Sequence, residues 1–338
     1  MANDLTSSQV ERQNILNNKY ALKKIENHLR LGGLEFEGDS WLTKQQLMTL
    51  FDVSDSTIEK YIANHGEELK ANGYKVLKGK KLNEFKSLHG GTVNDYGTKI
   101  SILGVFNFRA TLNLAMVLTE SERAKEIRSR ILDIVIDVVA ERAGGHTKYI
   151  NQRDSDYLPT AYTEYSYRKV FTDALNDYLD MDGRHKYAIY TNKIYQLVFK
   201  ENAKEYKQLL KLAKNDNVRD TLYSEVLKAI GSIENGLAHE MKDKSEMLSR
   251  KLKPLELNEI INRLEINPYL KPVIDDARTK MASRDMTFRD ALHKKLEAYI
   301  QTVPETDFDK FLGEASRSLE EQLSDPEVLE VLKRLKDR

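Results

Sequence analysis

The stretch LEFEGDSWLTKQQLMTLFDVSDSTIEKYI, residues 34–62, decides the fold of the N-terminal part of the chain. Apolar residues alternate on both sides of Gly38 and Asp39, and this pattern predicts a short β-hairpin. Residues 44–51 then place leucine and phenylalanine on one helical face, and a polar break separates them from a second helical pattern over residues 56–69. Two short helices joined by a tight turn predict a helix-turn-helix.

The first turn of the second helix carries residue types that bind DNA. In a helix-turn-helix, this turn presents side chains to base edges and backbone amides to phosphates. Hydroxyl groups bond bases or phosphates, whereas Asp55 and Glu59 would repel phosphates, although a carboxylate can accept a hydrogen bond from the cytosine amino group. The predicted DNA-contacting residues of the two helices are Thr43 and Lys44, which would touch the flanking backbone, and Ser54, Asp55, Ser56, Thr57 and Lys60.

A basic segment follows the second helix. Residues 72–86 hold five lysines against one acid, Glu84, and the pattern over 74–82 predicts a hairpin that turns at Gly79. A basic hairpin beside a helix-turn-helix is a winged arrangement, in which the wing would bind phosphates through Lys75, Lys78, Lys80 and Lys81. The plainer interpretation, a solvated hairpin in a protein that never binds DNA, stays open on pattern alone.

Helical patterns cover most of the remaining chain. They predict one helix over 8–29, helices over 108–118 and 120–142, and a nearly all-helical second half. The polar segment 147–156 marks a domain boundary. The expected fold is therefore mainly α, with an N-terminal helix (1–33), a winged helix-turn-helix region with short β-hairpins (34–146) and an all-α helical C-terminal domain (147–338).

Several positions of the opening stretch match a known family in order. Residues 34–62 resemble the N-terminal region of the RhuM family, the virulence-associated proteins of bacterial genomic islands and prophages. Asp52 stands where the family often has glycine or a small polar residue. The resemblance implies a DNA-binding regulator associated with phages and other mobile elements. The matching positions are Trp41-Leu42-Thr43, Gln46-Leu47, Leu50-Phe51, Val53-Ser54 and Thr57-Ile58.

A second block extends the resemblance. Residues 113–132 resemble the block that follows in the RhuM family, and similar blocks occur in the Bro-N and KilA-N domains of phages. Three glutamates are interleaved with the basic residues Arg123, Lys125, Arg128 and Arg130, so a solvated face with i,i+4 ion pairs is preferred over phosphate binding. The matching positions are Ser121, Arg123, Ala124, Ile127 and Arg128.

Residues 190–220 form the most distinctive stretch of the second half. The sequence YTNKIYQLVFKENAKEYKQLLKLAKNDNVRD resembles a segment that recurs in proteins linked to phages, plasmids and toxin–antitoxin loci. Its residues indicate no biochemical role, and its aromatic side chains fit a packed helix face better than a base-stacking surface. The helical second half predicts an interaction or oligomerisation module, because DNA-binding regulators with short half-sites usually dimerise.

Composition excludes several classes of protein. The 338 residues include 53 basic and 53 acidic side chains and no cysteine, which excludes disulfides, thiolate metal sites and thiol nucleophiles. The chain lacks a run of about 18 apolar residues, and its polar start lacks a signal peptide, so we expect a cytoplasmic protein without membrane contact. The seven histidines are scattered, and no phosphate-binding loop or nucleophile elbow occurs. We expect no catalytic site, metal or cofactor.

These observations favour a DNA-binding protein that represses or targets DNA without breaking bonds. Its expected partners are double-stranded DNA and a second copy of the chain, as a dimer, and the helical domain could also bind a protein partner. Two alternatives stay open. One is an interaction component, such as an antitoxin-like or phage-defence subunit, and the other is a metal-dependent nuclease that would use Asp275 and Asp276.

Overall fold

The computed structural model describes all residues except 1–4, 94–99, 314–323, 327–328 and 330–338. The described chain is mainly α-helical, as the sequence predicts, and has a small four-stranded antiparallel sheet in its N-terminal third. It divides into two compact units, Met1–Val138 and Val139–Arg338, which are described separately below. The three-part domain division drawn from the sequence stays a prediction.

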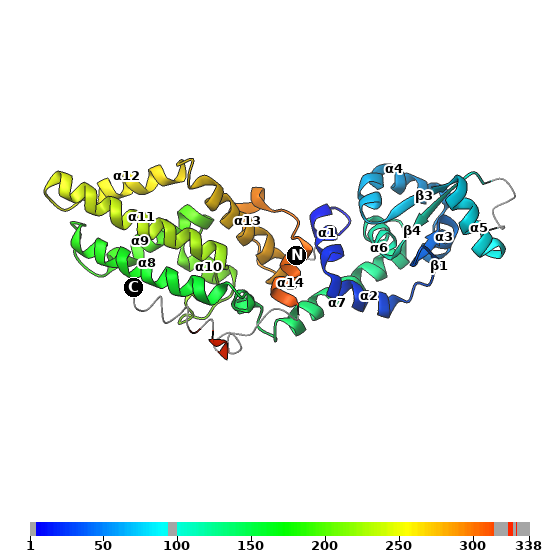
Figure 1. The fold of residues 1–338 in the computed structure, drawn as a ribbon, viewed down its shortest axis with the longest axis horizontal. Helices are drawn as coiled ribbons and strands as arrows, with labels where there is room; N and C mark the ends of the chain where they lie inside the picture. The colour runs from blue at the N-terminus through cyan, green and yellow to red at the C-terminus, as the bar shows by residue number, and fades with distance from the viewer. Residues whose placement is uncertain (1–4, 94–99, 314–323, 327–328, 330–338) are drawn as a thin grey trace. The chain divides into compact units, whose positions relative to one another are not determined.

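The first unit combines the sheet with helices on both of its faces (Figure 1). The hairpin expected at Gly38 and the helices expected over 44–51, 56–69, 108–118 and 120–142 are all confirmed. In chain order the elements are α1 (Gln9–Asn17), α2 (Lys19–Leu29), β1 (Leu34–Phe36), β2 (Asp39–Thr43), α3 (Lys44–Phe51), α4 (Asp55–Ala71), β3 (Tyr74–Lys78), α5 (Gly79–Val93), β4 (Ile102–Phe106), α6 (Phe108–Val117) and α7 (Glu122–Arg142).

The N-terminal helical pattern is broken at Asn18, so the prediction of a single helix over 8–29 is wrong. Asn18 leaves the helical region, with φ −81° and ψ 87°, and its side chain accepts a hydrogen bond of 3.1 Å from the Ala21 N–H. Asparagine favours this cap because its side-chain oxygen replaces a missing backbone acceptor. The break allows α1 and α2 to bury Leu16 and Ile25 in one cluster with α6 and α7.

A buried ion pair fixes α1 to the rest of the first unit. Arg12 donates two hydrogen bonds of 2.7 Å to the two carboxylate oxygens of Glu68 in α4. Asn113 of α6 donates a third, of 2.6 Å, to the same carboxylate. Both charges are buried, so each needs the other to offset the loss of hydration. The N-terminal helices are therefore an integral part of this unit.

The sheet has the strand order β1-β2-β4-β3, with antiparallel pairing throughout. β1 and β2 form the predicted hairpin, in which Phe36 pairs with Asp39. β4 then inserts between β2 and β3, so that Leu42 pairs with Phe106 on one side and Leu77 pairs with Leu103 on the other. This order leaves β3 at an edge of the sheet.

The second predicted hairpin, over 74–82, is wrong. β3 ends at Lys78, the helix α5 begins at Gly79, and β3 pairs with β4 across the intervening segment. The physical reason is the spacing of Leu82 and Phe85, which are three residues apart and fully buried, so they lie on one helical face that packs against the sheet. A strand would have placed these two side chains on opposite faces.

Two apolar clusters cover the two faces of the sheet. On one face, α5 packs over a cluster that includes Trp41, Leu77 and Phe85. On the other face, α3, α4 and α6 enclose a cluster that includes Phe51, Ile58 and Phe106. Figure 1 shows the strands between α5 on one side and α4 and α6 on the other. The packing fixes α3 and α4 against a rigid sheet.

The second unit is built from helices in its described part, as expected, apart from an isolated bridge between Leu179 and Leu252. Its apolar core includes Phe171, Ile194 and Ile230. The elements are η2 (Thr147–Arg153), α8 (Tyr157–Asp177), α9 (His185–Phe199), α10 (Ala203–Leu209), η3 (Val218–Thr221), α11 (Ser224–Leu248), α12 (Pro254–Glu265), α13 (Lys271–Phe288), η4 (Lys294–Tyr299) and α14 (Glu305–Leu312). Among the described residues, no helix is both long and apolar enough to cross a membrane.

Candidate nucleic-acid interface

The turn between α3 and α4 has the local geometry of a tight helix–helix junction. Asp52 ends α3 in the left-handed conformation, with φ 53°, which an aspartate adopts at a modest energetic cost. Thr43 caps the start of α3 together with Gln46 in a reciprocal capping box. Thr43 is only 2% exposed, so its side chain stabilises the helix and does not reach the surface where the predicted backbone contact would form.

The first turn of α4 presents three hydroxyl groups at the surface. Ser54 caps the helix, because its Oγ accepts a hydrogen bond from the Thr57 N–H. The Ser54 Oγ also lies 2.9 Å from the Ser56 Oγ and 2.9 Å from the Thr57 Oγ1. Ser54 and Ser56 are exposed and Thr57 is half-buried. The structure thus brings these three predicted residues together at an accessible helix start.

Lys44 neutralises the two acids of this turn. Its Nζ lies 2.8 Å from Asp55 Oδ1 and 2.6 Å from Glu59 Oε1. Partial burial opposes ionisation of Lys44, but the hydrogen bonds to Asp55 and Glu59 prevail and raise its pKa above the ordinary value. Lys44 was predicted to contact the DNA backbone, yet its ammonium group is bound to carboxylates. It lowers the negative charge that Asp55 and Glu59 would otherwise present.

Lys60, one turn further along α4, is also paired with an acid. Its Nζ lies 2.7 Å from Glu120 Oε1, and the Tyr61 hydroxyl donates a short hydrogen bond to the same carboxylate. The hydrogen bonds from Lys60 and Tyr61 lower the pKa of Glu120 to about 2. Lys60 remains exposed, with 58% of its side chain accessible, so it can still reach an anion beside α4.

Two of the four lysines of the predicted wing lie in β3, on opposite faces of the sheet. Lys78 shares a face of β3 with Tyr74. Burial raises the pKa of Tyr74, and the nearby charge of Glu59 raises it further. Lys75 lies on the opposite face, with its Nζ 4.6 Å from the centre of the Trp41 ring. The four are therefore not gathered on one hairpin.

The other two lysines of this set, Lys80 and Lys81, lie in the first turn of α5. Lys80 is 3.8 Å from Glu84 on the same helix, and its side chain is 91% exposed. Lys81 is 2.6 Å from Glu37 in the β1–β2 turn. All four lysines are exposed, but only Lys78 lies on the sheet face against which α4 packs.

Two arginines of the block 113–132 bind backbone carbonyls at helix ends. Arg123 donates hydrogen bonds to the carbonyls of Thr49 and Leu50, in the last turn of α3. Arg128 donates to the carbonyls of Ala115 and Leu118, at the end of α6. Arg123 is exposed, as expected for a solvated face, but the bonds of these two arginines to carbonyls outside α7 do not follow from the i,i+4 charge pattern. Lys125 does form an exposed pair of 3.2 Å, but with Glu122, three residues before it.

Ser121 completes the same junction and was not predicted to have a role. Its hydroxyl donates a hydrogen bond of 2.5 Å to the Phe51 carbonyl and accepts one from the Ala124 N–H. Ala124 is fully buried in the cluster beneath α3 and α4. The Ser-x-Arg-Ala motif thus fastens the end of α3 to the start of α7, which fixes the turn that leads into α4.

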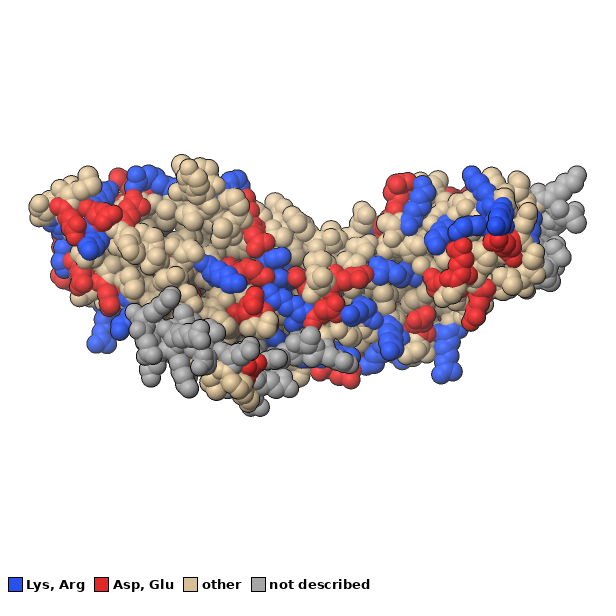
Figure 2. Space-filling model, viewed as in Figure 1, with Lys and Arg blue, Asp and Glu red and all other residues tan. Residues whose placement is uncertain are grey.

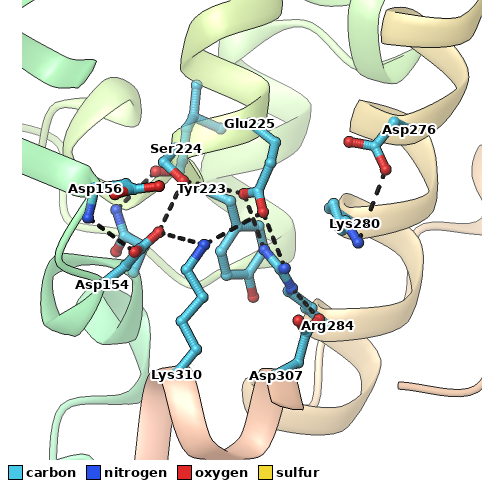
Figure 3. A network of polar contacts seen from close by, with 12 residues as sticks. Asp154, Asp156, Tyr223, Ser224, Glu225, Asp276, Lys280, Arg284, Asp307 and Lys310 are labelled. Atoms are coloured by element: carbon cyan, nitrogen blue, oxygen red, sulfur yellow. Dashed lines mark hydrogen bonds and ion pairs between the residues drawn. The ribbon is translucent and has the colours of Figure 1, made fainter. Parts of the chain in front are cut away.

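A network of charged side chains lies inside the second unit (Figure 3). Arg284 of α13 bonds Asp307 at 2.7 Å and both carboxylate oxygens of Glu225 at 3.0 Å. Lys310 of α14 lies 3.0 Å from Asp154. Burial opposes ionisation of Glu225, but the charges of Arg284 and Lys310 lower its pKa to about 2. The network holds α14 against α11 and α13, which is a structural role.

A second buried set in this unit surrounds His293. Its Nδ1 lies 2.7 Å from Glu201 Oε2 and its Nε2 lies 2.8 Å from Asp285 Oδ2. Burial disfavours the charged imidazole, but the hydrogen bonds to Asp285 and Glu201 raise the pKa of His293 to about 9. The ring is therefore a cation between two carboxylates at neutral pH, and it ties α13 to the start of α10.

The two acids of the nuclease alternative are bound to lysines of their own helix. Lys271 is 2.5 Å from Asp275, and Lys280 is 3.8 Å from Asp276. Across the part of the chain that the structure describes, no group of three or more His, Cys, Asp or Glu side chains is arranged to hold a metal ion. The structure therefore adds no support to a metal-dependent nuclease.

Charge on the molecular surface is mixed. Figure 2 shows basic and acidic side chains interspersed over the face that it draws, in keeping with a net charge of zero. A surface for a polyanion is therefore a local feature of this protein, and the exposed first turn of α4 is such a feature in the first unit. Comparison with protein-family models, with curated proteins and with solved structures finds no match.

Proposed function

We propose that the first unit binds double-stranded DNA and that α4 is its recognition helix. The observation that carries this proposal is the exposed, hydroxyl-lined first turn of α4, whose two acids are neutralised by Lys44. In this function α3, the turn at Asp52 and α4 act as a helix-turn-helix, and the start of α4 enters the major groove. The resemblance of residues 34–62 to the RhuM family supports the same function.

Each group at the start of α4 has a defined part in this mechanism. The hydroxyls of Ser54, Ser56 and Thr57 bond phosphates or base edges. The carboxylates of Asp55 and Glu59, held by Lys44, accept hydrogen bonds from cytosine amino groups, which read sequence in the major groove. Lys44 therefore acts as a positioning residue in this mechanism.

The antiparallel pair β3–β4 takes the place of the wing. Lys78 lies on its α4-facing side and contacts phosphates beside the recognition helix, while Lys75, Lys80 and Lys81 add a sequence-independent attraction. We propose occupancy of DNA, in repression or targeting, as the activity, with no bond broken and no cofactor required. A dimer of the chain would match the two halves of a pseudo-palindromic site.

The test is duplex binding by the full-length chain across a range of salt concentrations. The triple variant Lys78→Gln, Lys80→Gln, Lys81→Gln should weaken binding to all sequences. It should also reduce the slope of log K against log salt concentration by up to about 2.7. The matched control replaces Lys19, Lys23 and Lys24, which are exposed on α2, with glutamine. Thr57→Val should instead change the order of preferred sequences. Equal binding by all these variants would contradict the proposal.

A second candidate function rests on exposed apolar side chains around α12. Met247 and Leu255 lie near its N-terminal end and Ile266 and Tyr269 near its C-terminal end, with exposed fractions of 73% to 88%. Such side chains often mark a protein–protein contact. They favour the interaction component, antitoxin-like or part of a phage-defence system, or a self-association surface of a dimer. A stoichiometric co-purifying protein, together with no duplex binding at low salt, would favour this function over the first.

A further inference from the structure

The second unit has a cationic hollow of its own, in the stretch 190–220 that the sequence left without a role. Lysines recur at intervals of three or four from Lys200 to Lys214. Four of them line one shallow hollow of about 520 Å³ around α10 and the turn that follows it, and no acidic side chain shares this lining. We call it the lysine hollow and define it by Lys204, Lys207, Lys211 and Lys214.

The two glutamates between Lys200 and Lys207 are bound elsewhere. Glu201 is only 4% exposed and bonds His293 inside the unit. Glu205 accepts the Asn202 N–H at 2.8 Å, and its other carboxylate oxygen bonds Lys295 at 2.9 Å. Both glutamates are therefore held by other partners, and the charged residues of the lining itself are the four lysines.

Hydrogen bonds hold the hollow in shape. The Lys207 ammonium donates to the Lys214 carbonyl at 2.8 Å, and Lys148 donates to the Lys211 carbonyl at 2.6 Å. Asp216, in the loop that follows, accepts the Ala213 N–H at 2.7 Å. Lys204, Lys211 and Lys214 are exposed, whereas Lys207 is half-buried. The backbone is thus fixed while three ammonium groups are accessible to solvent.

We propose that the lysine hollow binds the phosphate backbone of nucleic acid, so that the second unit makes a sequence-independent contact of its own. Lysine is a compact cation that binds phosphate as a point charge, and the lining has no arginine fork or aromatic ring that could read a base. The charges are spread along an open surface and do not enclose a single group, which favours a chain of phosphates over one small phosphate compound. The choice of nucleic acid as occupant rests on the proposed function.

The experiment measures lysine acylation in the full-length chain by mass spectrometry, with and without a random-sequence duplex at low salt. The duplex should slow acylation of Lys204, Lys211 and Lys214 several-fold. Lys169, Lys228 and Lys242 are exposed in the same unit and outside the hollow, and they should react as before. Equal reactivity of the hollow lysines with and without duplex would overturn the proposal.

A binding measurement gives the second arm. The variant Lys204→Gln, Lys211→Gln, Lys214→Gln should lower duplex affinity at about 50 mM salt and reduce the salt slope by up to about 2.7 units. The control variant with glutamine at 169, 228 and 242 has the same net charge and should bind like the wild type. Equal affinity of the hollow variant and this control would count against the lysine hollow as a DNA contact.

The outcomes separate this inference from the proposed function. Protection of Lys78 without protection of the hollow overturns the inference and leaves α4 as the DNA-binding element. Protection of the hollow without Lys78 overturns the assignment of α4 and supports the second-unit contact. Inorganic phosphate is the probe for the remaining case: if it alone protects the hollow lysines and the duplex does not, the site takes small phosphate compounds and the nucleic-acid assignment fails.

Discussion

The ammonium group of Lys44, the first residue of α3, lies 2.6 Å from the carboxylate of Glu59 in α4. This contact joins the starts of the two helices that form the turn, and it neutralises an acid at the surface where DNA is proposed to bind. Ion pairs at the surface contribute about 1 kcal/mol or less each to stability. Its larger effect is therefore expected on the binding of an anion.

The first prediction concerns this pair. Lys44→Met leaves Asp55 and Glu59 without their counter-charge, so duplex affinity at low salt should fall roughly tenfold, as expected when carboxylates face phosphates. The triple variant Lys44→Met, Asp55→Asn, Glu59→Gln should recover most of the affinity. Fluorescence anisotropy with a labelled duplex measures both. If Lys44→Met binds as tightly as the wild type, the acids do not lie near DNA.

The second prediction concerns the buried pair Arg12–Glu68. Burial of Glu68 opposes its ionisation, but hydrogen bonds from Arg12 and Asn113 lower its pKa below 4.5, its ordinary value. A carboxyl group with a lowered pKa in the folded state adds stability that is complete above its unfolded pKa and is lost as the pH falls through the folded value. Glu68→Gln should therefore destabilise the chain by about 3–5 kcal/mol at neutral pH.

The pH dependence distinguishes charge from packing at this site. The difference in unfolding free energy between the wild type and Glu68→Gln should shrink as the pH falls below 4.5. Urea unfolding at a series of pH values gives this difference directly. If this difference stays constant down to acid pH, the loss of stability in Glu68→Gln comes from packing and not from the charge of the carboxylate.

The third prediction tests the cap at the end of α3. Arg123→Ala removes the hydrogen bonds to the Thr49 and Leu50 carbonyls and should lower the unfolding free energy by about 1 kcal/mol. The neighbouring Lys125→Ala removes an exposed pair with Glu122 and should change it by less than about 0.5 kcal/mol. Thermal or urea unfolding compares the two. Equal changes in unfolding free energy for the two variants would mean that the hydrogen bonds of Arg123 do not stabilise the end of α3.

The fourth prediction concerns His293. Its pKa of about 9 is raised above the ordinary 6.5, so its contribution to stability is complete below pH 6.5 and declines as the pH rises through about 9. The unfolding free energy of His293→Gln, measured by urea unfolding, should therefore fall furthest below that of the wild type near pH 6.5. The two values should come closest above pH 9. His146→Gln, at an exposed position, is the control and should leave the profile unchanged.

The sequence predicts the elements whose side-chain period is strong. The capping pattern of Thr43 and Ser54 and the apolar spacing behind them place α3 and α4 correctly, because both signals are local. The hairpin at Gly38 follows from alternation on both sides of one turn. These local signals also identify the exposed hydroxyls at the start of α4.

The wrong predictions involve partners that are distant in the sequence. Gly79 followed by lysines is typical of a hairpin turn. The partner of β3 is instead β4, which comes after the whole of α5. In the sequence, only the spacing of Leu82 and Phe85 indicates that helix. The pairing of Lys44 with Glu59 and the capping of α3 by Arg123 also depend on tertiary contacts. Arg123 binds the free carbonyls in the last turn of α3 because the fold brings it to the end of that helix. The order of charges along the sequence does not show this contact.

Trp41 is the one tryptophan of the chain, and it is 2% exposed on the sheet face that α5 covers. Its indole N–H donates to the Phe36 carbonyl, and the Lys75 ammonium lies over its ring. Its fluorescence is therefore an intrinsic optical signal from the first unit alone, while circular dichroism averages the helices of both units. Unfolding monitored by emission and by ellipticity on one sample would show whether the two units melt together, without any label or truncation.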